Sequence, residues 1–531
     1  MIRRLIPAAA VVALLAGCSD STDPARPVGD AAPGTLRVLA GSELADLQPI
    51  LDEAAKATGI SVKFSFTGTV EGAEKVASGA AEQGFDAVWF SSNRYLELVP
   101  EAQKRLSTPA KVMSSPVVLG LPAAKVRELG WDTKRVGWAE IAEAAGAQKF
   151  TYGMTDPSAS NSGFSALVGV AAALSGSGSA LDAARIDAVA PQLKQFFSAQ
   201  KLSAGSSGWL SEAYQRRAQD PGARVDGLIN YESVLLSMPQ PLTLVYPSDG
   251  VVTADYPLTL LTSASSEARE AHRKLSDHLR SADVQRKIME TTHRRPAVPQ
   301  VQLDGKFATK DLVELPFPGS QSAVDGLITT YFDQLRRPSR TLYVLDTSGS
   351  MQGDRIDGLR QALTGLTGAD ESLAGRFSRF HGREQVTLLP FSSSAQPALK
   401  YEVPQNDPRP VLDQIRATAT NLDASGGTAI YSSLRGGYDV LRQQIDADPN
   451  RFTSIVLMTD GENTGSEGIT DFQLFHLSLP PDLKSIPIFP VLFGESAAAE
   501  MEQVAKMSGG KVFDARSRSL SAAFKEIRGY Q

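Results

Sequence analysis

The sequence is poor in the residues that most often carry catalysis. Its 531 residues include one cysteine and five histidines, and the histidines are scattered. They are His272, His278, His293, His381 and His476. None of them has a spaced partner that would indicate a metal site or a catalytic triad, and there is no Walker loop, no Gly-x-Ser-x-Gly elbow and no cysteine nucleophile. These absences argue against an enzyme.

Long basic and long apolar runs are also missing. The formal net charge is −6 and no long basic run occurs, which argues against nucleic-acid binding. Beyond the N-terminal leader, no segment is long and apolar enough to be a transmembrane helix. The apolar content of 42% and the charged content of 21% are typical of a globular protein, and the length predicts more than one domain.

Residues 1–18 have the pattern of a secretion signal. A basic start is followed by an apolar core and by small residues at a cleavage point, in the sequence Leu-Ala-Gly-Cys18. This pattern resembles a bacterial lipoprotein signal with its lipobox at residues 15–18. The resemblance implies that Cys18 carries lipid (palmitate or a related acyl chain) and that the protein is anchored in the cell membrane on the extracytoplasmic face. The alternatives are an ordinary signal peptide and a short membrane anchor. Residues 19–34 are polar and proline-rich, which predicts a flexible tether.

From residue 35 the sequence alternates between strand-like and helix-like segments. Strands are predicted at residues 36–40, 60–66 and 86–90, and each precedes a loop rich in Ser, Thr and Gly. Such loops lead into helix N-termini, whose free N–H groups suit a small polar or anionic ligand. The candidate ligand-binding residues are Ser42, Thr67, Thr69, Ser91, Ser92, Ser160, Asn161 and Ser162, with Tyr231 nearby. The alternative is that these side chains only cap helices.

The order of these segments over residues 35–296 resembles an extracellular solute-binding protein of the type II periplasmic class. The resemblance rests on this order, on the loop at residues 156–163 and on the turn at residues 247–250. It implies two α/β lobes with a cleft for a small solute and with crossing strands at residues 115–121 and 256–261. Ordinary solute receptors of ABC importers end after such a module, whereas this chain continues, so importer docking is in doubt.

The remainder divides into a connecting segment and a second α/β domain. Residues 297–338 connect the two modules, and apolar residues at helical spacing over 323–335 predict an amphipathic helix that packs between domains. Residues 339–531 again alternate between strands and helices. Strands are predicted at residues 341–345, 386–391, 454–458, 486–493 and 511–513. This alternation predicts a doubly wound, Rossmann-like sheet with helices on both faces.

Five residues with oxygen-bearing side chains stand out in this last domain. They are Asp346, Ser348, Ser350, Thr428 and Asp460. Asp346 and Asp460 each end a strand-like run, and the carboxyl ends of parallel strands meet in one crevice of an α/β fold. Carboxylates and hydroxyls without histidine or cysteine suit a hard cation such as Mg²⁺. On its own, the Asp-x-Ser-x-Ser pattern could also be a helix-capping turn.

These residues, with the Gly-Gly-Thr428 turn and the Thr-Asp460-Gly segment, resemble the von Willebrand factor A (VWA) domain over residues 339–531. The resemblance implies a metal-ion-dependent adhesion site that holds Mg²⁺, with Ca²⁺ or Mn²⁺ possible. It also implies that the site binds an envelope or extracellular protein through an acidic side chain of that partner.

Two functions are consistent with the sequence. In the first, the chain is a membrane-anchored extracytoplasmic binding lipoprotein whose VWA domain binds a partner protein, while the solute-binding-like module recognises a small ligand or only presents the VWA domain. In the alternative, it is the substrate-binding receptor of an ABC importer with an accessory VWA domain. For both functions we expect an α/β protein, with a two-lobed type II periplasmic-binding-protein-like module followed by a doubly wound domain.

Overall fold

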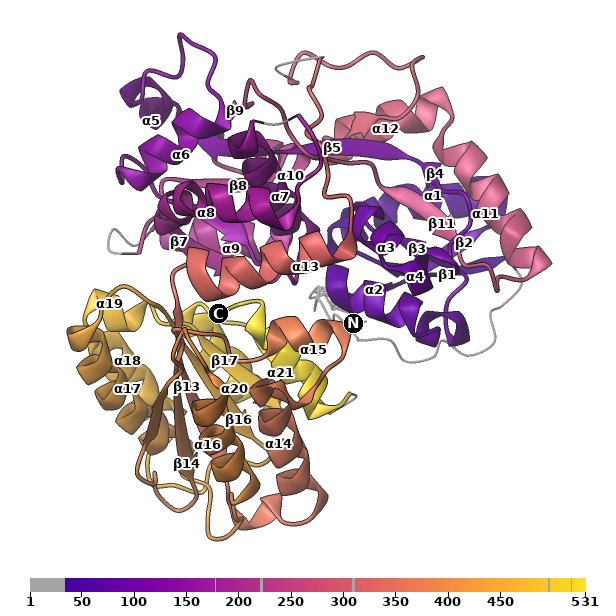
Figure 1. The fold of residues 1–531 in the computed structure, drawn as a ribbon. Coiled ribbons are helices and arrows are strands. Elements are labelled where there is room, and N and C mark those ends of the chain that lie inside the picture. Colours follow the sequence, from indigo (N-terminus) through magenta and orange to yellow (C-terminus); the bar gives the residue numbers. More distant parts are fainter. Residues whose placement is uncertain (1–33, 177, 220–222, 308–310, 495–496, 517) are drawn as a thin grey trace, which may run out of the picture.

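The computed structural model describes residues 34–531 except 177, 220–222, 308–310, 495–496 and 517. The leader, Cys18 and most of the expected tether lie outside the described residues. Within them, no helix is both long enough and apolar enough to cross a membrane. The chain forms α/β layers throughout, as the sequence predicts (Figure 1).

Lobe 1 of the first module is built on a sheet with the strand order β2-β1-β3-β11-β4. Its strands are β1 (Thr35–Ala40), β2 (Ser61–Phe66), β3 (Ala87–Trp89), β4 (Ala110–Lys111) and β11 (Pro257–Leu260). Strands β1, β2 and β3 are parallel, and β11 runs antiparallel to β3. The helices of this lobe are α1 (Gln48–Thr58), α2 (Thr69–Ala77), α3 (Arg94–Leu98), α4 (Pro100–Gln103), α11 (Ser266–Leu279) and α12 (Ala282–Thr292).

Lobe 2 is built on a second sheet with the order β10-β5-β8-β6-β7, and β9 and β12 also pair with β5. Its strands are β5 (Met113–Leu121), β6 (Tyr152–Thr155), β7 (Gln200–Ala204), β8 (Gly227–Tyr231), β9 (Thr243–Val245), β10 (Thr253–Ala254) and β12 (Arg295–Pro296). Its helices are α5 (Ala123–Glu128), α6 (Trp138–Gly146), α7 (Asn161–Ser175), α8 (Ala183–Ser198), α9 (Ser207–Arg217) and α10 (Glu232–Leu236). The chain crosses between the lobes from β4 to β5, from β10 to β11 and again from α12 to β12.

A helix joins the first module to the C-terminal domain. Helix α13 (Gln321–Thr330) continues into a wider helical turn at Tyr331–Leu335. The Tyr331 hydroxyl donates to Gln200 Oε1 in lobe 2 at 3.0 Å, and the Tyr95 hydroxyl in lobe 1 donates to Asp325 at 2.9 Å. Apolar side chains of this segment belong to the core of the lobes, and Arg376 of the C-terminal domain pairs with Asp325 at 3.2 Å. The segment therefore lies between the first module and the C-terminal domain (Figure 1).

The C-terminal domain has one sheet with the order β15-β14-β13-β16-β17-β18. Its strands are β13 (Ser339–Asp346), β14 (Gln385–Phe391), β15 (Leu399–Glu402), β16 (Phe452–Thr459), β17 (Ile488–Leu492) and β18 (Phe513–Asp514). Only β15, an exposed edge strand absent from the sequence prediction, runs antiparallel to its neighbour. The other pairings of this sheet are parallel, as in a doubly wound fold.

Helices cover both faces of this sheet, and each face has its own apolar core. One core includes side chains of α14 (Asp354–Thr364), α16 (Arg409–Thr420) and α21 (Leu520–Arg528). The other includes side chains of α17 (Ile430–Ala447), α18 (Ile469–Ser478), α19 (Pro481–Lys484) and α20 (Ala498–Ser508). The short helix α15 (Leu373–Ser378) instead reaches the first module, where Phe377 joins the core of the lobes.

Candidate functional site

The strand order of the C-terminal sheet brings the two aspartates together. Strands β13 and β16 are parallel neighbours, with Leu345 opposite Met458, so Asp346 and Asp460 leave the sheet at the same edge. Their exposed fractions are 0% and 1%. Burying two carboxylates side by side is unfavourable unless a cation or hydrogen-bond donors compensate them.

Donors from the adjacent loops hold the Asp346 carboxylate in place. Its Oδ1 accepts from the Ser348 backbone N–H at 2.8 Å, and its Oδ2 accepts from the Thr459 hydroxyl at 2.7 Å. Burial raises the pKa of Asp346 despite these hydrogen bonds, and the nearby charge of Asp460 acts in the same direction. A cation at this edge would favour the ionised form of both aspartates.

The two serine hydroxyls form a chain of hydrogen bonds that ends on the second aspartate. Ser348 Oγ lies 2.9 Å from Ser350 Oγ, and Ser350 Oγ donates to Asp460 Oδ1 at 2.8 Å. Ser348 is buried whereas Ser350 is exposed. The cluster therefore reaches from the buried end of β13 to the protein surface.

Backbone hydrogen bonds dock the loop of Thr428 against both strand-end loops. Gly349 N donates to Gly426 O at 2.9 Å, and Thr464 N donates to Thr428 O at 2.8 Å. Gly426 has a φ of 85°, which favours glycine and lets this turn fold back over the serine loop. The structure thus brings all five residues of the predicted metal site to one edge of the sheet.

The donor set fits a hard divalent cation. It consists of carboxylate and hydroxyl oxygens, which are the ligand types that Mg²⁺ and Ca²⁺ prefer. Among the described residues no group of three or more His, Cys, Asp or Glu side chains could hold a metal. A cation at this edge would therefore depend on the hydroxyls of Ser348, Ser350 and Thr428 as well as on the two aspartates.

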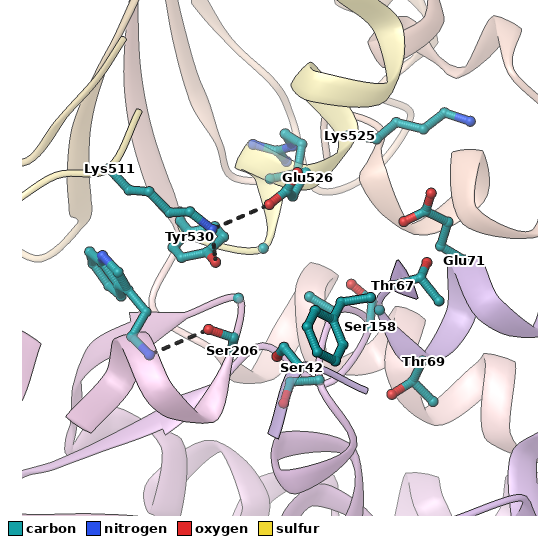
Figure 2. Close-up of a pocket in the computed structure, with 18 of the residues that line it drawn as sticks. Ser42, Thr67, Thr69, Glu71, Ser158, Ser206, Lys511, Lys525, Glu526 and Tyr530 are labelled. Atoms are coloured by element: carbon teal, nitrogen blue, oxygen red, sulfur yellow. Dashed lines mark hydrogen bonds and ion pairs between the residues drawn. The ribbon is translucent and has the colours of Figure 1, made fainter. Parts of the chain in front are cut away.

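A second site lies where the first module meets the C-terminal domain. A cavity of about 770 Å³ is lined by loops of both lobes and by helices and loops of the C-terminal domain. Six of the residues predicted to bind a ligand line it, namely Ser42, Thr67, Thr69, Ser91, Ser160 and Asn161. Figure 2 shows Ser42, Thr67 and Thr69 on the side of lobe 1, opposite Lys511 and Tyr530 of the C-terminal domain.

The remaining candidates, Ser92, Ser162 and Tyr231, do not line this cavity. Ser92 Oγ accepts from Arg94 N at the start of α3, and Ser162 Oγ lies 2.8 Å from both Thr155 Oγ1 and Ser207 Oγ. Tyr231 is buried, and its hydroxyl donates to Ser91 Oγ at 2.8 Å. Ser92 and Ser162 thus stabilise local structure, and Tyr231 joins the two lobes across the base of the cleft.

Comparison with protein families agrees with this division into modules. Residues 36–291 match the family described as bacterial extracellular solute-binding protein, and residues 341–462 match the von Willebrand factor type A domain. The chain combines a solute-binding domain with a VWA domain.

Curated relatives share parts of the chain. Inter-alpha-trypsin inhibitor heavy chain H4 of Bos taurus is 25% identical over 252 residues, which cover 45% of this chain and 26% of that protein. Calcium-activated chloride channel regulator 1 of Equus caballus is 35% identical over 174 residues, which cover 32% of this chain and 16% of that protein. The chain thus spans about a quarter or less of the length of these relatives.

Solved structures are similar to each module separately. The periplasmic binding protein AfuA from Actinobacillus pleuropneumoniae, with exogenous fructose-6-phosphate bound, has a TM-score of 0.45 and 12% identity and covers 57% of this chain and 99% of its own. A von Willebrand factor type A structure from Catenulispora acidiphila has a TM-score of 0.30 and 17% identity and covers 36% of this chain and 42% of its own.

Sequence reasoning missed one charged residue at the edge of the VWA sheet that carries the two aspartates. Arg355, in the first turn of α14, places its Nη1 2.6 Å from Asp460 Oδ2. It thereby neutralises one of the two buried carboxylates. No sequence signal indicated this contact, because the two residues lie 105 positions apart and Arg355 belongs to no part of the Asp-x-Ser-x-Ser pattern.

We expect Arg355→Gln to strengthen Mg²⁺ binding. The guanidinium competes with a cation for Asp460, and its side chain is 38% exposed, so water screens the interaction. The expected gain in affinity is therefore modest, about fivefold. Calorimetric titration of the full chain checks it, with Arg442→Gln on the exposed face of α17 as the matched control. Weaker Mg²⁺ binding in Arg355→Gln would instead show that the arginine helps to position Asp460.

Proposed function

We propose that this chain is a membrane-anchored extracytoplasmic binding protein whose VWA domain binds a partner protein in a metal-dependent way. The observation that carries the proposal is the cluster at the edge of the VWA sheet, where two buried aspartates meet the hydroxyls of Ser348 and Ser350 and the docked loop of Thr428. The proposed activity is binding, not catalysis.

The proposed metal ligands are Asp346, Ser348, Ser350, Thr428 and Asp460, with Mg²⁺ as the cation and Ca²⁺ or Mn²⁺ as alternatives. A divalent cation bound there would offer an open coordination position to one more oxygen ligand. Because Arg355 neutralises part of the charge on Asp460, the protein supplies little negative charge to the cation. An anionic ligand from outside, such as the side chain of Glu or Asp, is therefore the partner group that this site favours.

The position of the site leaves it accessible to a partner. Strand β13 begins at Ser339, next to the connecting segment, and ends at Asp346. The strand ends that carry the aspartates therefore face away from the solute-binding domain (Figure 1). The loops at residues 352–354, 425–427 and 462–465 surround this edge and would determine which carboxylate-bearing protein binds. We propose another envelope protein or an extracellular protein as the partner.

We expect capture of the partner to depend on a divalent cation. Immobilised full-length protein should retain a partner from envelope extract in Mg²⁺, lose it in EDTA and recover it when Mg²⁺ is restored. Thr428→Ala should abolish the Mg²⁺-dependent fraction because it removes one of the three hydroxyl ligands. Thr420→Ala, which changes an exposed threonine at the end of α16, should behave as the wild type.

Capture that is unchanged in EDTA would contradict this proposal. It would place the protein interface elsewhere on the chain and leave the aspartates and hydroxyls with a structural role. Capture that is lost in EDTA but retained in Thr428→Ala would contradict only the assignment of Thr428 as a ligand. The two results separate the existence of the site from its composition.

We further propose that Cys18 carries the lipid anchor. The support is the basic and apolar leader that ends in Leu-Ala-Gly-Cys18. The wild type should be found in the membrane fraction, and Cys18→Ser should move to the soluble fraction or keep its leader uncleaved. Ser19→Ala serves as the matched control, because it leaves the cysteine intact. Membrane fractionation and processing of Cys18→Ser that equal those of the wild type would contradict the lipobox.

The solute-binding domain supports a second role for the same chain, recognition of a small solute. The family match over residues 36–291 and the hydroxyl-lined cavity both favour it. A receptor for an ABC importer remains the alternative function. In this structure, however, the VWA domain covers one side of the lobes and contacts both of them, so an importer would have to dock on another face.

A further inference from the structure

Residues of lobe 1, of lobe 2 and of the VWA domain all line the cavity between the modules. The VWA domain contacts each lobe directly. Ala374 N donates to Glu74 Oε2 of lobe 1 at 2.8 Å, and Arg216 Nη2 of lobe 2 donates to Gly509 O at 3.2 Å. The ring of Trp209 on α9 meets that of Tyr530 at a centroid distance of 5.1 Å. A ligand in this cavity would therefore touch both domains (Figure 2).

The two lobes are in direct contact with each other across the cleft. Besides the hydrogen bond between Tyr231 and Ser91, Thr69 N donates to Ala159 O across the cleft at 3.4 Å. The space that remains lies nearer the VWA domain, between Thr67 and Thr69 on one side and Lys511 and Tyr530 on the other (Figure 2). The VWA domain thus forms a wall of the space that is left for a ligand.

The charged groups of the cavity wall are largely paired with one another. Lys511 Nζ lies 3.4 Å from Glu526 and Arg518 Nη1 lies 2.5 Å from the same carboxylate. Lys75 lies 2.9 Å from Glu71. Further pairs join Lys525 with Asp370 and Arg528 with Glu384, and the exposed Lys506 lies at the rim. An ionic ligand would have to break such pairs, so the wall favours a ligand without net charge.

The uncharged groups of the wall are hydroxyls and aromatic rings. Within the part of the chain that the structure describes, the hydroxyls of Ser42 and Thr69 have no hydrogen-bond partner. Burial also raises the pKa of Glu43, which favours its neutral form. Phe66, Trp209 and Tyr530 supply apolar ring surface. Hydroxyls beside ring faces suit a compact ligand that has its own hydroxyls and apolar C–H surface.

We propose that this interdomain cavity binds a neutral polyhydroxy ligand of monosaccharide to disaccharide size, and that the VWA domain supplies part of the site. The volume of about 770 Å³ lies within the range of small-molecule sites. The inference rests on the proposed solute recognition by the first module and specifies its ligand class. Because both domains line the cavity, bound ligand favours the docked arrangement of the two domains over a separated one.

Calorimetric titration of the full chain with glucose, maltose, inorganic phosphate and glycine tests the proposal. At least one of the two sugars should bind, while phosphate and glycine should not. Thr69→Val, on lobe 1, and Tyr530→Phe, on the VWA domain, each remove one hydroxyl and should weaken sugar binding about tenfold. Thr262→Val changes an exposed threonine away from the cavity and should bind as the wild type does.

Several results would overturn the proposal. Binding of phosphate or glycine in preference to both sugars would show a solute-binding domain with a different ligand class. Sugar binding that is unchanged in Thr69→Val and Tyr530→Phe would place the ligand elsewhere. No binding by any probe, with metal-dependent capture of the protein partner intact, would reject the cavity as a ligand site but leave the proposed function of the VWA domain standing.

Discussion

Replacing Asp346 with alanine is expected to lower the affinity of the full chain for Mg²⁺ by about 100-fold or more. Asp346 is fully buried at the end of β13, so its charge acts on a cation with little screening by water. Its neighbour Asp460 cannot compensate for the loss, because Arg355 already neutralises part of that carboxylate. Titration calorimetry with wild type and variant measures the difference directly.

The design of this experiment must separate metal binding from folding. Asp346→Ala also removes the acceptor of the Ser348 N–H and of the Thr459 hydroxyl. Asp346→Asn keeps the size of the side chain and a carbonyl acceptor while removing the charge, so it should lose Mg²⁺ affinity with a smaller effect on the loop. Asp439→Ala removes an exposed carboxylate on α17 and should bind Mg²⁺ normally. Equal affinity of Asp346→Asn and the wild type would reject Asp346 as a metal ligand.

The meeting of the candidate metal ligands at one edge of the sheet could be predicted from the sequence, because it depends only on the ends of two neighbouring strands. Asp346, Ser348 and Ser350 are fixed by one tight turn after β13, and Asp460 directly follows the neighbouring strand β16. Parallel pairing of two such strands is sufficient to bring the groups together. Arg355 could not be found in this way, because its position depends on how α14 packs against the edge of the sheet.

The cavity was predictable only in part, for a related reason. The hydroxyl-rich loops of Ser42, Thr67 and Thr69 follow lobe 1 strands, and their place in the wall follows from the order of the strands. The side chains of Lys511, Lys525 and Tyr530 reach the same cavity only because the VWA domain docks on the lobes. Docking of one domain on another depends on surface complementarity, which leaves no periodic pattern in the sequence. The edge strand β15 was missed because it is only 4 residues long and three of them are exposed, so little buried apolar surface marks it in the sequence.

Glu384→Gln is expected to destabilise the VWA domain by about 3–5 kcal/mol. The Glu384 carboxylate is 1% exposed and accepts from Arg336 Nη2 at 2.5 Å and from Arg528 Nη2 at 2.7 Å. Burial by itself would raise the pKa of Glu384, but the charges of Arg528 and Arg336 outweigh it and lower the pKa below 4.5. Glutamine would leave two buried guanidinium groups without the carboxylate that both of them contact. Urea unfolding at neutral pH measures the loss of unfolding free energy.

The pH dependence of this effect identifies its electrostatic origin. Because the folded-state pKa of Glu384 is lowered, its contribution to stability is present above pH 4.5 and is lost as the pH falls through the folded-state value. The difference in unfolding free energy between wild type and Glu384→Gln should therefore become smaller at acid pH, whereas a difference caused by altered packing would not. Glu371→Gln, at an exposed position, should unfold as the wild type does. Arg336 lies in the connecting segment, and Arg528 lies on α21 beside the cavity. A large loss of unfolding free energy in Glu384→Gln would therefore show that one buried carboxylate stabilises both the connection between the modules and the wall of the cavity.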